Sequence, residues 1–199
     1  DSNSSEDEET IQLWGNSYSI DNTVELDLTS NELQGEIPSK IGELINLEKL
    51  DLKSNSLSGN IPLSLINLEN LIELNLYNNM LSSDIDFIEV IENEEIVDTL
   101  IINNSFIIIT NLTNLNYLTL ETNMFEGPIP DEINNLSNLI GLDLRDNMFS
   151  GGIPASLGEL LNLEYLYLHN NDFSGEIPQT ICNLNIDFTS EEYFNISNN

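Results

Sequence analysis

A frame of 13 positions recurs along the chain, and it limits the possible fold more than any other feature. Leucines alternate with polar residues at its start, then come Asn, Gly, Ile and Pro; the segment from Leu142 to Pro154 is a complete copy. The steps between copies are 24, 24, 44, 24 and 24 residues. The Asn of the frame is found at Asn31, Asn55, Asn79, Asn123, Asn147 and Asn171. A fixed period in this range predicts stacked coils, in which each repeat buries its apolar side chains against its neighbours.

Each part of the frame predicts a local structure. The alternating start predicts a short strand whose leucines point inward. The Asn carboxamide both donates and accepts, so it can bind the backbone of its own coil and of the next. Gly suits a bend, and Pro suits the start of a short turn whose apolar residues, spaced by three, favour a 3₁₀ helix. We therefore expect an α/β solenoid: a right-handed, curved stack of about seven coils, with a parallel sheet on its concave face and 3₁₀ or irregular turns on its convex face.

The frame also sets the expected organisation of the chain. We expect an acidic, mobile tail at residues 1–10, an N-terminal cap at 11–23, the solenoid at 24–184 and a whole or incomplete C-terminal cap at 185–199. The only Trp, Trp14, is interpreted as covering the first coil in preference to forming a ligand site. The 44-residue step predicts an irregular repeat at 82–117, with one degenerate coil from Thr99 to Phe106 and Asn104 in the Asn ladder. Four phenylalanines are expected to line the core of the second half: Phe106, Phe125, Phe149 and Phe173.

Composition excludes several partners. The chain has 35 acidic and 4 basic residues, a formal net charge of −31. Nucleic acid is excluded as a partner because phosphate contacts need Lys and Arg, and an anionic membrane surface would repel the chain. The sequence has no apolar run long enough for a membrane span, and the sequence as given does not begin with a signal peptide, as would also be true of a mature or trimmed chain. The charge is interpreted as a means of solubility or as an adaptation to high salt or divalent cations.

The sequence does not predict an enzyme. With one His and one Cys, few pairs of nucleophile and base are possible, and no catalytic or phosphate-binding motif occurs. No cofactor and no metal site is predicted; the acidic residues between Asp84 and Asp98 lack a Ca²⁺ loop motif and favour a solvated face. Cys182 is expected either to be a buried free thiol or to have a partner beyond Asn199.

The G-x-I-P form of the frame resembles the plant-type leucine-rich repeats of receptor-kinase ectodomains and polygalacturonase-inhibiting proteins. The resemblance extends from about Leu13 to Leu184. Trp14-Gly15, followed by the segment from Val24 to Leu28, resembles the N-terminal cap that leads into the first repeat of those ectodomains. That cap usually holds a Cys pair, whereas Ser17 stands about where one of these Cys residues is expected. The resemblance implies an extracellular or cell-surface protein that binds a protein, peptide or glycan.

The residues that separate the strand leucines would face the concave surface, and their types suggest a binding site. Three of the four basic residues, the only His and four of the six Tyr fall on these positions. Tyr and Arg are enriched in binding hot spots. The predicted ligand-binding residues are Lys49, Lys53, Tyr77, Tyr117, Arg145, Tyr165, Tyr167 and His169. In the alternative interpretation, the basic residues only neutralise acids on neighbouring strands, such as Asp27, Asp51 and Asp143. The degenerate coil would add Asp98, Leu100 and Ile102 to this face.

Two other functions remain open on the sequence. One is a structural role, in which the chain assembles with copies of itself as a coat or filament subunit. The other, less favoured, is ice binding by regularly spaced polar residues. Glycosylation sequons begin at Asn103, Asn111 and Asn135, and they matter only in a eukaryotic secretory pathway.

Overall fold

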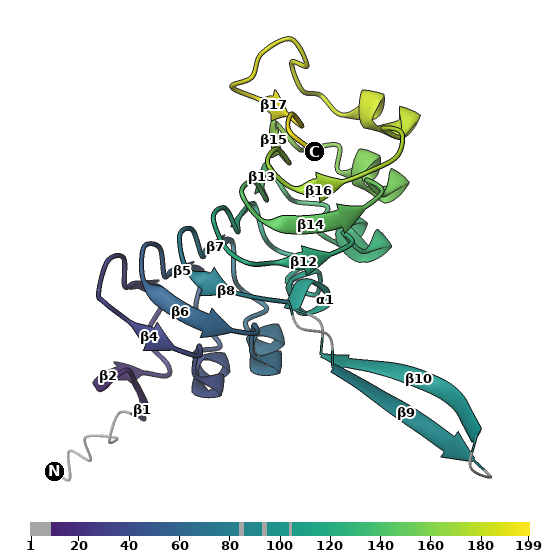
Figure 1. The fold of residues 1–199 in the computed structure, drawn as a ribbon. Coiled ribbons are helices and arrows are strands. Elements are labelled where there is room, and N and C mark those ends of the chain that lie inside the picture. The colour runs from purple at the N-terminus through teal and green to yellow at the C-terminus, as the bar shows by residue number, and fades with distance from the viewer. Residues whose placement is uncertain (1–8, 84–85, 93–94, 104) are drawn as a thin grey trace, which may run out of the picture.

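The protein is a curved stack of coils, described by a computed structural model at residues 9–83, 86–92, 95–103 and 105–199 (Figure 1). Each coil adds one short strand to a parallel sheet of seven strands. In spatial order these are β3 (Glu25–Asp27), β5 (Lys49–Asp51), β7 (Glu73–Asn75), β11 (Tyr117–Thr119), β13 (Gly141–Asp143), β15 (Tyr165–Tyr167) and β17 (Phe194–Asn195). The predicted solenoid with its parallel sheet is confirmed.

The alternation within each strand decides which residues are buried. The central leucines are in register across the sheet and 5% exposed or less; they are Leu26, Leu50, Leu74, Leu118, Leu142 and Leu166. Their neighbours on either side point to the opposite face, as the period of two in a strand requires. The same register therefore aligns the outward residues of successive strands in columns.

A second set of short strands follows the Asn of each coil. These are β4 (Gln34–Gly35), β6 (Ser56–Gly59), β8 (Met80–Leu81), β12 (Glu126–Gly127), β14 (Met148–Gly151) and β16 (Asp172–Phe173). They form two parallel three-stranded sheets, linked by a bridge between Ser82 and Met124. The frame glycines have φ between 76° and 86°, a conformation that disfavours side chains and that explains the bend expected there.

Short helices complete the coils on the convex side. Five 3₁₀ helices each follow the Pro of the frame: η1 (Ser39–Glu43), η2 (Leu63–Asn67), η3 (Asp131–Asn135), η4 (Ala155–Glu159) and η5 (Gln179–Asn183). Each directs one Ile or Leu into the core, such as Ile41 in η1. The spacing of three residues between apolar side chains therefore predicted the 3₁₀ helices correctly.

The frame asparagines form the predicted ladder. The Asn55 side-chain nitrogen donates to the carbonyl oxygens of Leu28 in the preceding coil and Leu52 in its own coil, at 2.9 and 2.8 Å. The Asn55 side-chain oxygen accepts from the backbone N–H groups of Asn31 and Leu33, both at 3.0 Å. The pattern recurs along the stack, so each coil satisfies backbone groups of the coil before it.

A second column of asparagines, which the frame did not include, lies just before the concave strands. Each donates from its side chain to a backbone carbonyl of the preceding coil at 2.8–3.0 Å. The members are Asn46, Asn70, Asn114, Asn138 and Asn162. Two hydrogen-bonded columns therefore tie neighbouring coils together.

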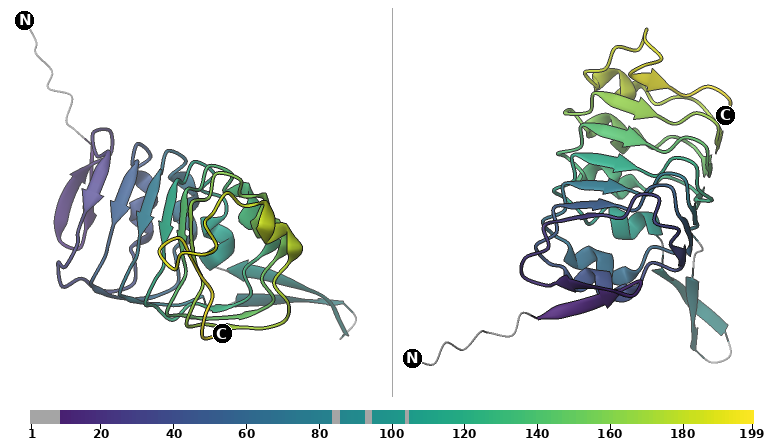
Figure 2. Two further views of the ribbon diagram at one scale, coloured as in Figure 1. Left: turned by 90° about the horizontal axis from the view of Figure 1, so that it is seen from above. Right: turned by 90° about the vertical axis from the view of Figure 1, so that its left-hand side faces the viewer.

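The predicted degenerate coil is wrong. Strand β11 pairs directly with β7, and the N–H of Leu81 donates to the side-chain oxygen of Asn123 at 3.0 Å, so no coil lies between Asn79 and Asn123. The additional residues of the long step instead form an antiparallel hairpin of β9 (Asp86–Glu92) and β10 (Glu95–Asn103), which projects from the stack (Figures 1 and 2). Asn104 lies outside the described residues.

After the hairpin, the chain returns to the core through α1 (Ser105–Ile109), which packs against η2. Phe106 of this helix is buried and meets Phe149 edge-on, with ring centroids 5.4 Å apart. Phe149 in turn stacks between Phe125 and Phe173 at 6.1 and 6.2 Å. The expected aromatic core is present, but Phe106 reaches it from a helix and not from a coil of its own.

Each end of the stack has its own structure. The hairpin of β1 (Thr10–Leu13) and β2 (Asn16–Ser19) buries Ile11 and Leu13 in the core, and Trp14 packs against the same core. At the other end, Cys182 on η5 is a free, exposed cysteine, so the prediction of a buried thiol is wrong. On this short helix Ile181 is the residue that faces the core, and its neighbour Cys182 faces outward. No helix in the described ranges is long and apolar enough to cross a membrane.

Candidate functional site: the concave sheet

The eight predicted ligand-binding residues all belong to the parallel sheet or to the two residues that follow one of its strands. Lys49, Tyr117, Tyr165 and Tyr167 lie within strands. Lys53, Tyr77, Arg145 and His169 follow β5, β7, β13 and β15. The other three expected members of this face, Asp98, Leu100 and Ile102, lie in β10 of the projecting hairpin and not in the sheet.

The register fixes two columns of outward residues across β3, β5, β7, β11, β13 and β15. The first column is Glu25, Lys49, Glu73, Tyr117, Gly141 and Tyr165. The second column is Asp27, Asp51, Asn75, Thr119, Asp143 and Tyr167. The surface therefore changes from charged and acidic near the N-terminal end to aromatic near the C-terminal end.

The N-terminal half holds exposed ion pairs. The Nζ atom of Lys49 lies 3.7 Å from a Glu25 carboxylate oxygen and 4.0 Å from one of Glu73. Such exposed pairs contribute little to stability. Lys53 places its Nζ atom 5.1 Å from the ring centroid of Tyr77, a cation–π distance. The charge-neutralising alternative therefore describes Lys49 well.

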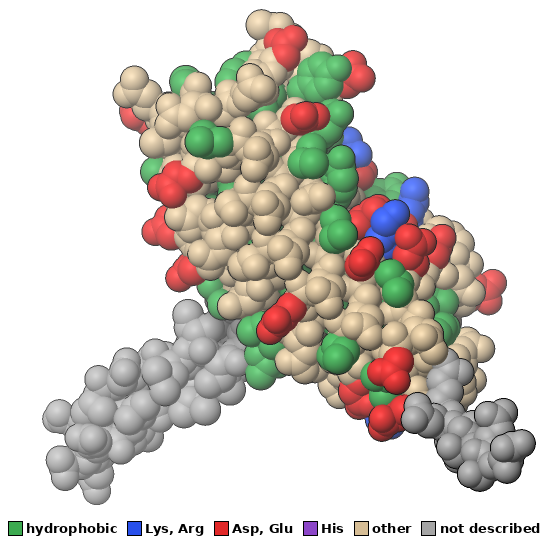
Figure 3. Space-filling view, turned by 180° about the vertical axis from the view of Figure 1, so that it is seen from behind, with side chains coloured by type: hydrophobic (Ala, Val, Ile, Leu, Met, Phe, Trp, Pro, Cys, Tyr) green, Lys and Arg blue, Asp and Glu red, His purple; other side chains and the backbone are tan. Residues whose placement is uncertain are grey.

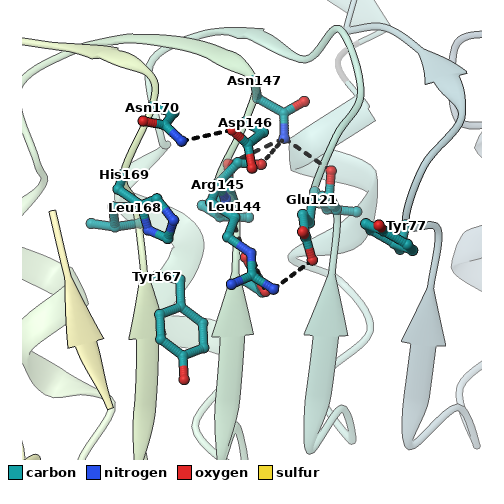
Figure 4. A network of polar contacts seen from close by, with 12 residues as sticks. Tyr77, Glu121, Leu144, Arg145, Asp146, Asn147, Tyr167, Leu168, His169 and Asn170 are labelled. Carbon is teal, nitrogen blue, oxygen red and sulfur yellow. Dashed lines mark hydrogen bonds and ion pairs between the residues drawn. The ribbon is translucent and has the colours of Figure 1, made fainter. Parts of the chain in front are cut away.

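Arg145 is the centre of a tighter cluster in the C-terminal half (Figure 4). Its Nη2 atom lies 2.7 Å from the Oε2 atom of Glu121, and its Nε atom lies 3.2 Å from the Oδ2 atom of Asp143. Its guanidinium carbon lies 5.1 Å from the ring centroid of Tyr167. The geometry at Nε does not make a hydrogen bond, and among the described residues no other group accepts its proton. Arg145 thus has a fixed orientation, and its Nε–H group makes no hydrogen bond to the described residues.

Burial sets the protonation of this cluster. Burial raises the pKa of Asp143 to about 7, because it disfavours the charged carboxylate; Arg145 opposes the rise and Glu121 adds to it. Burial alone would lower the pKa of Arg145, but its hydrogen bond to Glu121 and the charge of Asp143 raise it overall. Burial also raises the pKa of Tyr167, with Asp143 adding to the effect. Arg145 is therefore cationic at neutral pH, whereas Asp143 titrates there.

His169 adds another unused polar atom. Its ring meets that of Tyr167 edge-on, with centroids 6.2 Å apart. Its Nδ1 atom is buried without a hydrogen-bond partner in the part of the chain that the structure describes. Beside it, Asn170 donates to the side chain of Asp146 at 2.7 Å and accepts from the side chain of Asn198. These contacts hold the turn after β15 in place.

Two hollows lie on this face. One, of about 410 Å³, is lined by Lys53, Asn75, Tyr77, Thr119, Glu121, Asp143 and Arg145. The other, of about 220 Å³, lies over β3, β5 and β7 around Lys49. In the space-filling view of Figure 3, acidic side chains are spread over the surface, while the main group of Lys and Arg side chains lies at one edge among acidic ones.

One aromatic residue of this surface escaped the sequence analysis. Tyr193 immediately precedes β17, whose Phe194 pairs with Leu166, so it lies beside Tyr165. The two rings are tilted, with centroids 5.6 Å apart. The frame stops at Leu184, so no periodic signal placed Tyr193 on the sheet.

The remaining predicted features lie elsewhere. Among the described residues, no group of three or more His, Cys, Asp or Glu could hold a metal ion. The sequon residues Asn111 and Asn135 are exposed outside the concave sheet, and Asn103 is the last residue of β10. Their glycosylation stays a prediction.

Comparison with known proteins agrees with this architecture. A family model described as Leucine Rich Repeat matches residues 22–44, 46–68, 114–136, 138–160 and 162–184. The comparison with curated proteins gave no match. Among solved structures, the ectodomain of the membrane receptor kinase GASSHO1/SCHENGEN3 from Arabidopsis thaliana, in complex with Casparian strip integrity factor 2, is similar. The identity is 34% and the TM-score 0.68, over 80% of this chain and 17% of that one.

Two further structures have the same repeats. The Arabidopsis receptor kinase HAESA ectodomain, in complex with an IDA peptide hormone, is 30% identical with a TM-score of 0.66, over 88% of this chain and 26% of that one. A leucine-rich repeat protein of Leptospira interrogans is 29% identical with a TM-score of 0.59, over 80% of this chain and 34% of that one. The chain thus spans only 17% and 26% of the length of the GASSHO1/SCHENGEN3 and HAESA ectodomains.

Proposed function

The chain belongs to the leucine-rich repeat family, and on this premise we propose that it is a non-catalytic recognition module that binds a peptide on its concave sheet. The HAESA ectodomain was solved with a peptide hormone, and the receptor RGFR1 is likewise described as a peptide hormone receptor in complex with its ligand RGF2. The ligand could instead be a protein or a glycan, because the G-x-I-P frame also resembles that of polygalacturonase-inhibiting proteins. We place the module outside the cell or at its surface, as in the receptor ectodomains.

The distribution of residue types on the sheet carries this proposal. In a chain with 35 acidic and 4 basic residues, three basic residues and four tyrosines lie on one face. Tyr and Arg supply much of the energy in interfaces because they combine apolar area with polar contacts. Neighbouring strands lie about 4.8 Å apart, so an extended ligand that crosses the sheet meets a new side chain at each strand.

Arg145 gives the face a polar anchor. Its carboxylate partners and Tyr167 already hold the guanidinium in one orientation, so a ligand would not have to immobilise this side chain. Its Nε–H and the Nδ1 atom of His169 are buried and make no hydrogen bond among the described residues. A ligand would therefore meet the exposed part of the guanidinium, since 32% of the Arg145 side chain is exposed.

The proposal is tested by selecting peptides from a displayed random library on the immobilised chain. The affinity of the selected peptides is then measured by calorimetry for the wild type and for the double variant Tyr165→Ser/Tyr167→Ser. A matched control, Leu63→Ser/Leu161→Ser, removes two side chains that are 65% and 62% exposed and lie outside the concave sheet. We expect the tyrosine variant to bind at least about tenfold more weakly and the control to bind as the wild type does. Equal affinities for all three would refute the proposal.

Self-assembly is the second candidate, and the C-terminal end of the stack favours it. A hollow of about 240 Å³ at that end is lined by Ile153, Phe173, Ile177 and Ile196, together with polar residues, and Ile177 is 51% exposed. Exposed apolar surface is a common feature of protein–protein contact sites, so this end could pack against another copy. Light scattering after size exclusion, in low salt, in high salt and with millimolar Ca²⁺, separates the two functions. A monomer of 22.4 kDa throughout supports the recognition module, whereas defined oligomers support assembly.

A further inference from the structure

Gly141 leaves an opening in a column of large side chains. It lies in β13, paired with Tyr117 of β11 on one side and with Tyr165 of β15 on the other. Every other strand from β3 to β15 contributes a charged or aromatic residue to this column. The two tyrosines therefore flank a strand position that has no side chain.

Both rings border the space above this glycine. A Cβ atom added to Gly141 would lie 3.1 Å from Cδ1 of Tyr117 and 3.7 Å from Cδ2 of Tyr165. These two ring atoms are consequently no more than about 7 Å apart, roughly the span of two successive van der Waals contacts. The opening, which we name the tyrosine slot (Tyr117, Gly141 and Tyr165), is therefore at most one layer of atoms wide between these two ring atoms.

The walls of the slot are supported from outside. The ring of Tyr193 packs against that of Tyr165, with centroids 5.6 Å apart, so one wall is held from the C-terminal side. Tyr117 is 44% exposed, and Gly141 and Tyr165 are partly exposed, so all three residues of the slot are in contact with solvent. A ligand group can therefore enter from the concave side and contact rings that are already in position.

The charge around the slot is negative. Asp143 follows Gly141 by two residues on the same face, a distance of about 6.6 Å along a strand. Two basic residues of this sheet do not reverse this sign: Lys49 lies between two carboxylates, and Arg145 also contacts two. Each of these clusters keeps a net negative charge when its carboxylates are ionised, and the chain as a whole carries −31.

Resting on the proposed peptide-binding function, we propose that the tyrosine slot binds the guanidinium group of an arginine side chain in a basic peptide. A guanidinium is flat, so it fits a space one layer thick, and it stacks on aromatic faces. It is cationic, so the field of the surrounding carboxylates attracts it. A lysine ammonium is more strongly hydrated and not planar, and it gains less from two flat walls.

The test uses three short probes: acetyl-Gly-Arg-Gly-amide, the same peptide with citrulline, which has the shape of arginine without its charge, and the same peptide with lysine. Each is titrated at pH 8 and 0.15 M salt into protein with ¹³C-labelled tyrosine, and the ring signals of all six tyrosines are followed by NMR. We expect the arginine probe to shift the signals of Tyr117 and Tyr165 and to bind about tenfold more tightly than citrulline. The lysine probe should fall between them.

Two variants separate the slot from general attraction to an acidic protein. Gly141→Ala places a methyl group on the floor of the slot and should abolish the preference for arginine over citrulline. Gly152→Ala is the matched control, because its new Cβ would meet only the Ser174 carbonyl oxygen at 3.8 Å, and it should bind as the wild type does. Equal binding of arginine and citrulline, or wild-type binding by Gly141→Ala, would overturn the inference.

Failure of the slot can be distinguished from failure of the proposed function. If the arginine probe shifts only the signals of Tyr77 and Tyr167, the slot is wrong while recognition on the concave sheet stands. If the library peptides lose no affinity in Tyr165→Ser/Tyr167→Ser, the proposed function itself is wrong.

Discussion

Replacing Asp143 with Asn should remove a specific part of the pH dependence of stability. Asp143 has a pKa of about 7 in the folded protein, raised from 3.8 chiefly by burial, with Arg145 opposing and Glu121 adding. Between these two values the folded state binds a proton that the unfolded state releases, so stability falls as pH rises towards 7 and then levels off. From pH 5 to pH 8.5 this one group lowers the free energy of unfolding by about 3 kcal/mol, at 1.36 kcal/mol for each pH unit crossed.

The assay is urea unfolding followed by circular dichroism from pH 5 to pH 8.5 at constant ionic strength. Because the other acidic residues also repel one another, the relevant quantity is the difference between wild type and Asp143→Asn. We expect the wild type to lose about 3 kcal/mol relative to the variant across this range. Asp27→Asn is the control: a backbone hydrogen bond from Thr29 lowers the pKa of this exposed Asp, so its effect is confined to acidic pH. Parallel curves for wild type and Asp143→Asn would refute the account of this cluster.

Three further predictions concern the stack itself. Asn147→Ala removes side-chain hydrogen bonds to the backbone of two coils and should lower the free energy of unfolding in urea by about 2–4 kcal/mol. Asn138→Ala loses one exposed hydrogen bond and should lower it by about 1 kcal/mol. Equal losses would contradict the larger contribution of the part-buried Asn ladder. Phe149→Ala removes the ring that contacts three other rings and should cost about 3–5 kcal/mol by the same measurement, and a loss below about 1 kcal/mol would contradict a packed aromatic core. Gly158→Ala would place a Cβ against the backbone carbonyl of Thr180 in the next coil and should lower stability by about 1–3 kcal/mol, whereas thermal unfolding of Gly152→Ala should match the wild type.

The repeat made most of the fold predictable. A 24-residue period fixes the strand, the ladder Asn, the Gly bend and the helix after Pro, because each coil must match the coil beside it. The second asparagine column was equally periodic in the sequence. It was missed because the 13-position frame ends at its Pro, while Asn138 and Asn162 lie beyond that Pro, four residues before the strand leucines Leu142 and Leu166.

The hairpin was beyond this reasoning. Residues 99–106 match the spacing of the apolar, Asn and aromatic positions of the frame, whereas the residues from Asp86 to Glu92 have apolar pairs separated by acidic residues and show no period of two. A local apolar pattern does not show which strand a segment pairs with. The ladder contact between the coils of Asn79 and Asn123 decides the question, and this contact is a property of the folded stack.

The candidate site was predictable in position but not in chemistry. Counting outward positions placed Arg145 and Tyr167 on one surface. The sequence could not show that Arg145 lies close to both Asp143 and Glu121. Its contact with Asp143, two residues away, depends on rotamers, and its contact with Glu121 of the neighbouring coil depends also on the register. The tyrosine slot was also hidden, since a glycine in a column contributes no side chain to notice.

The most direct test of recognition on the concave sheet is a crystal structure of the chain with the tightest peptide from the library selection. The account predicts that the peptide crosses the strands from β7 to β15 and contacts Tyr117, Arg145 and Tyr167. A peptide bound on the 3₁₀ helices or at either end of the stack, with the concave sheet empty, would contradict it.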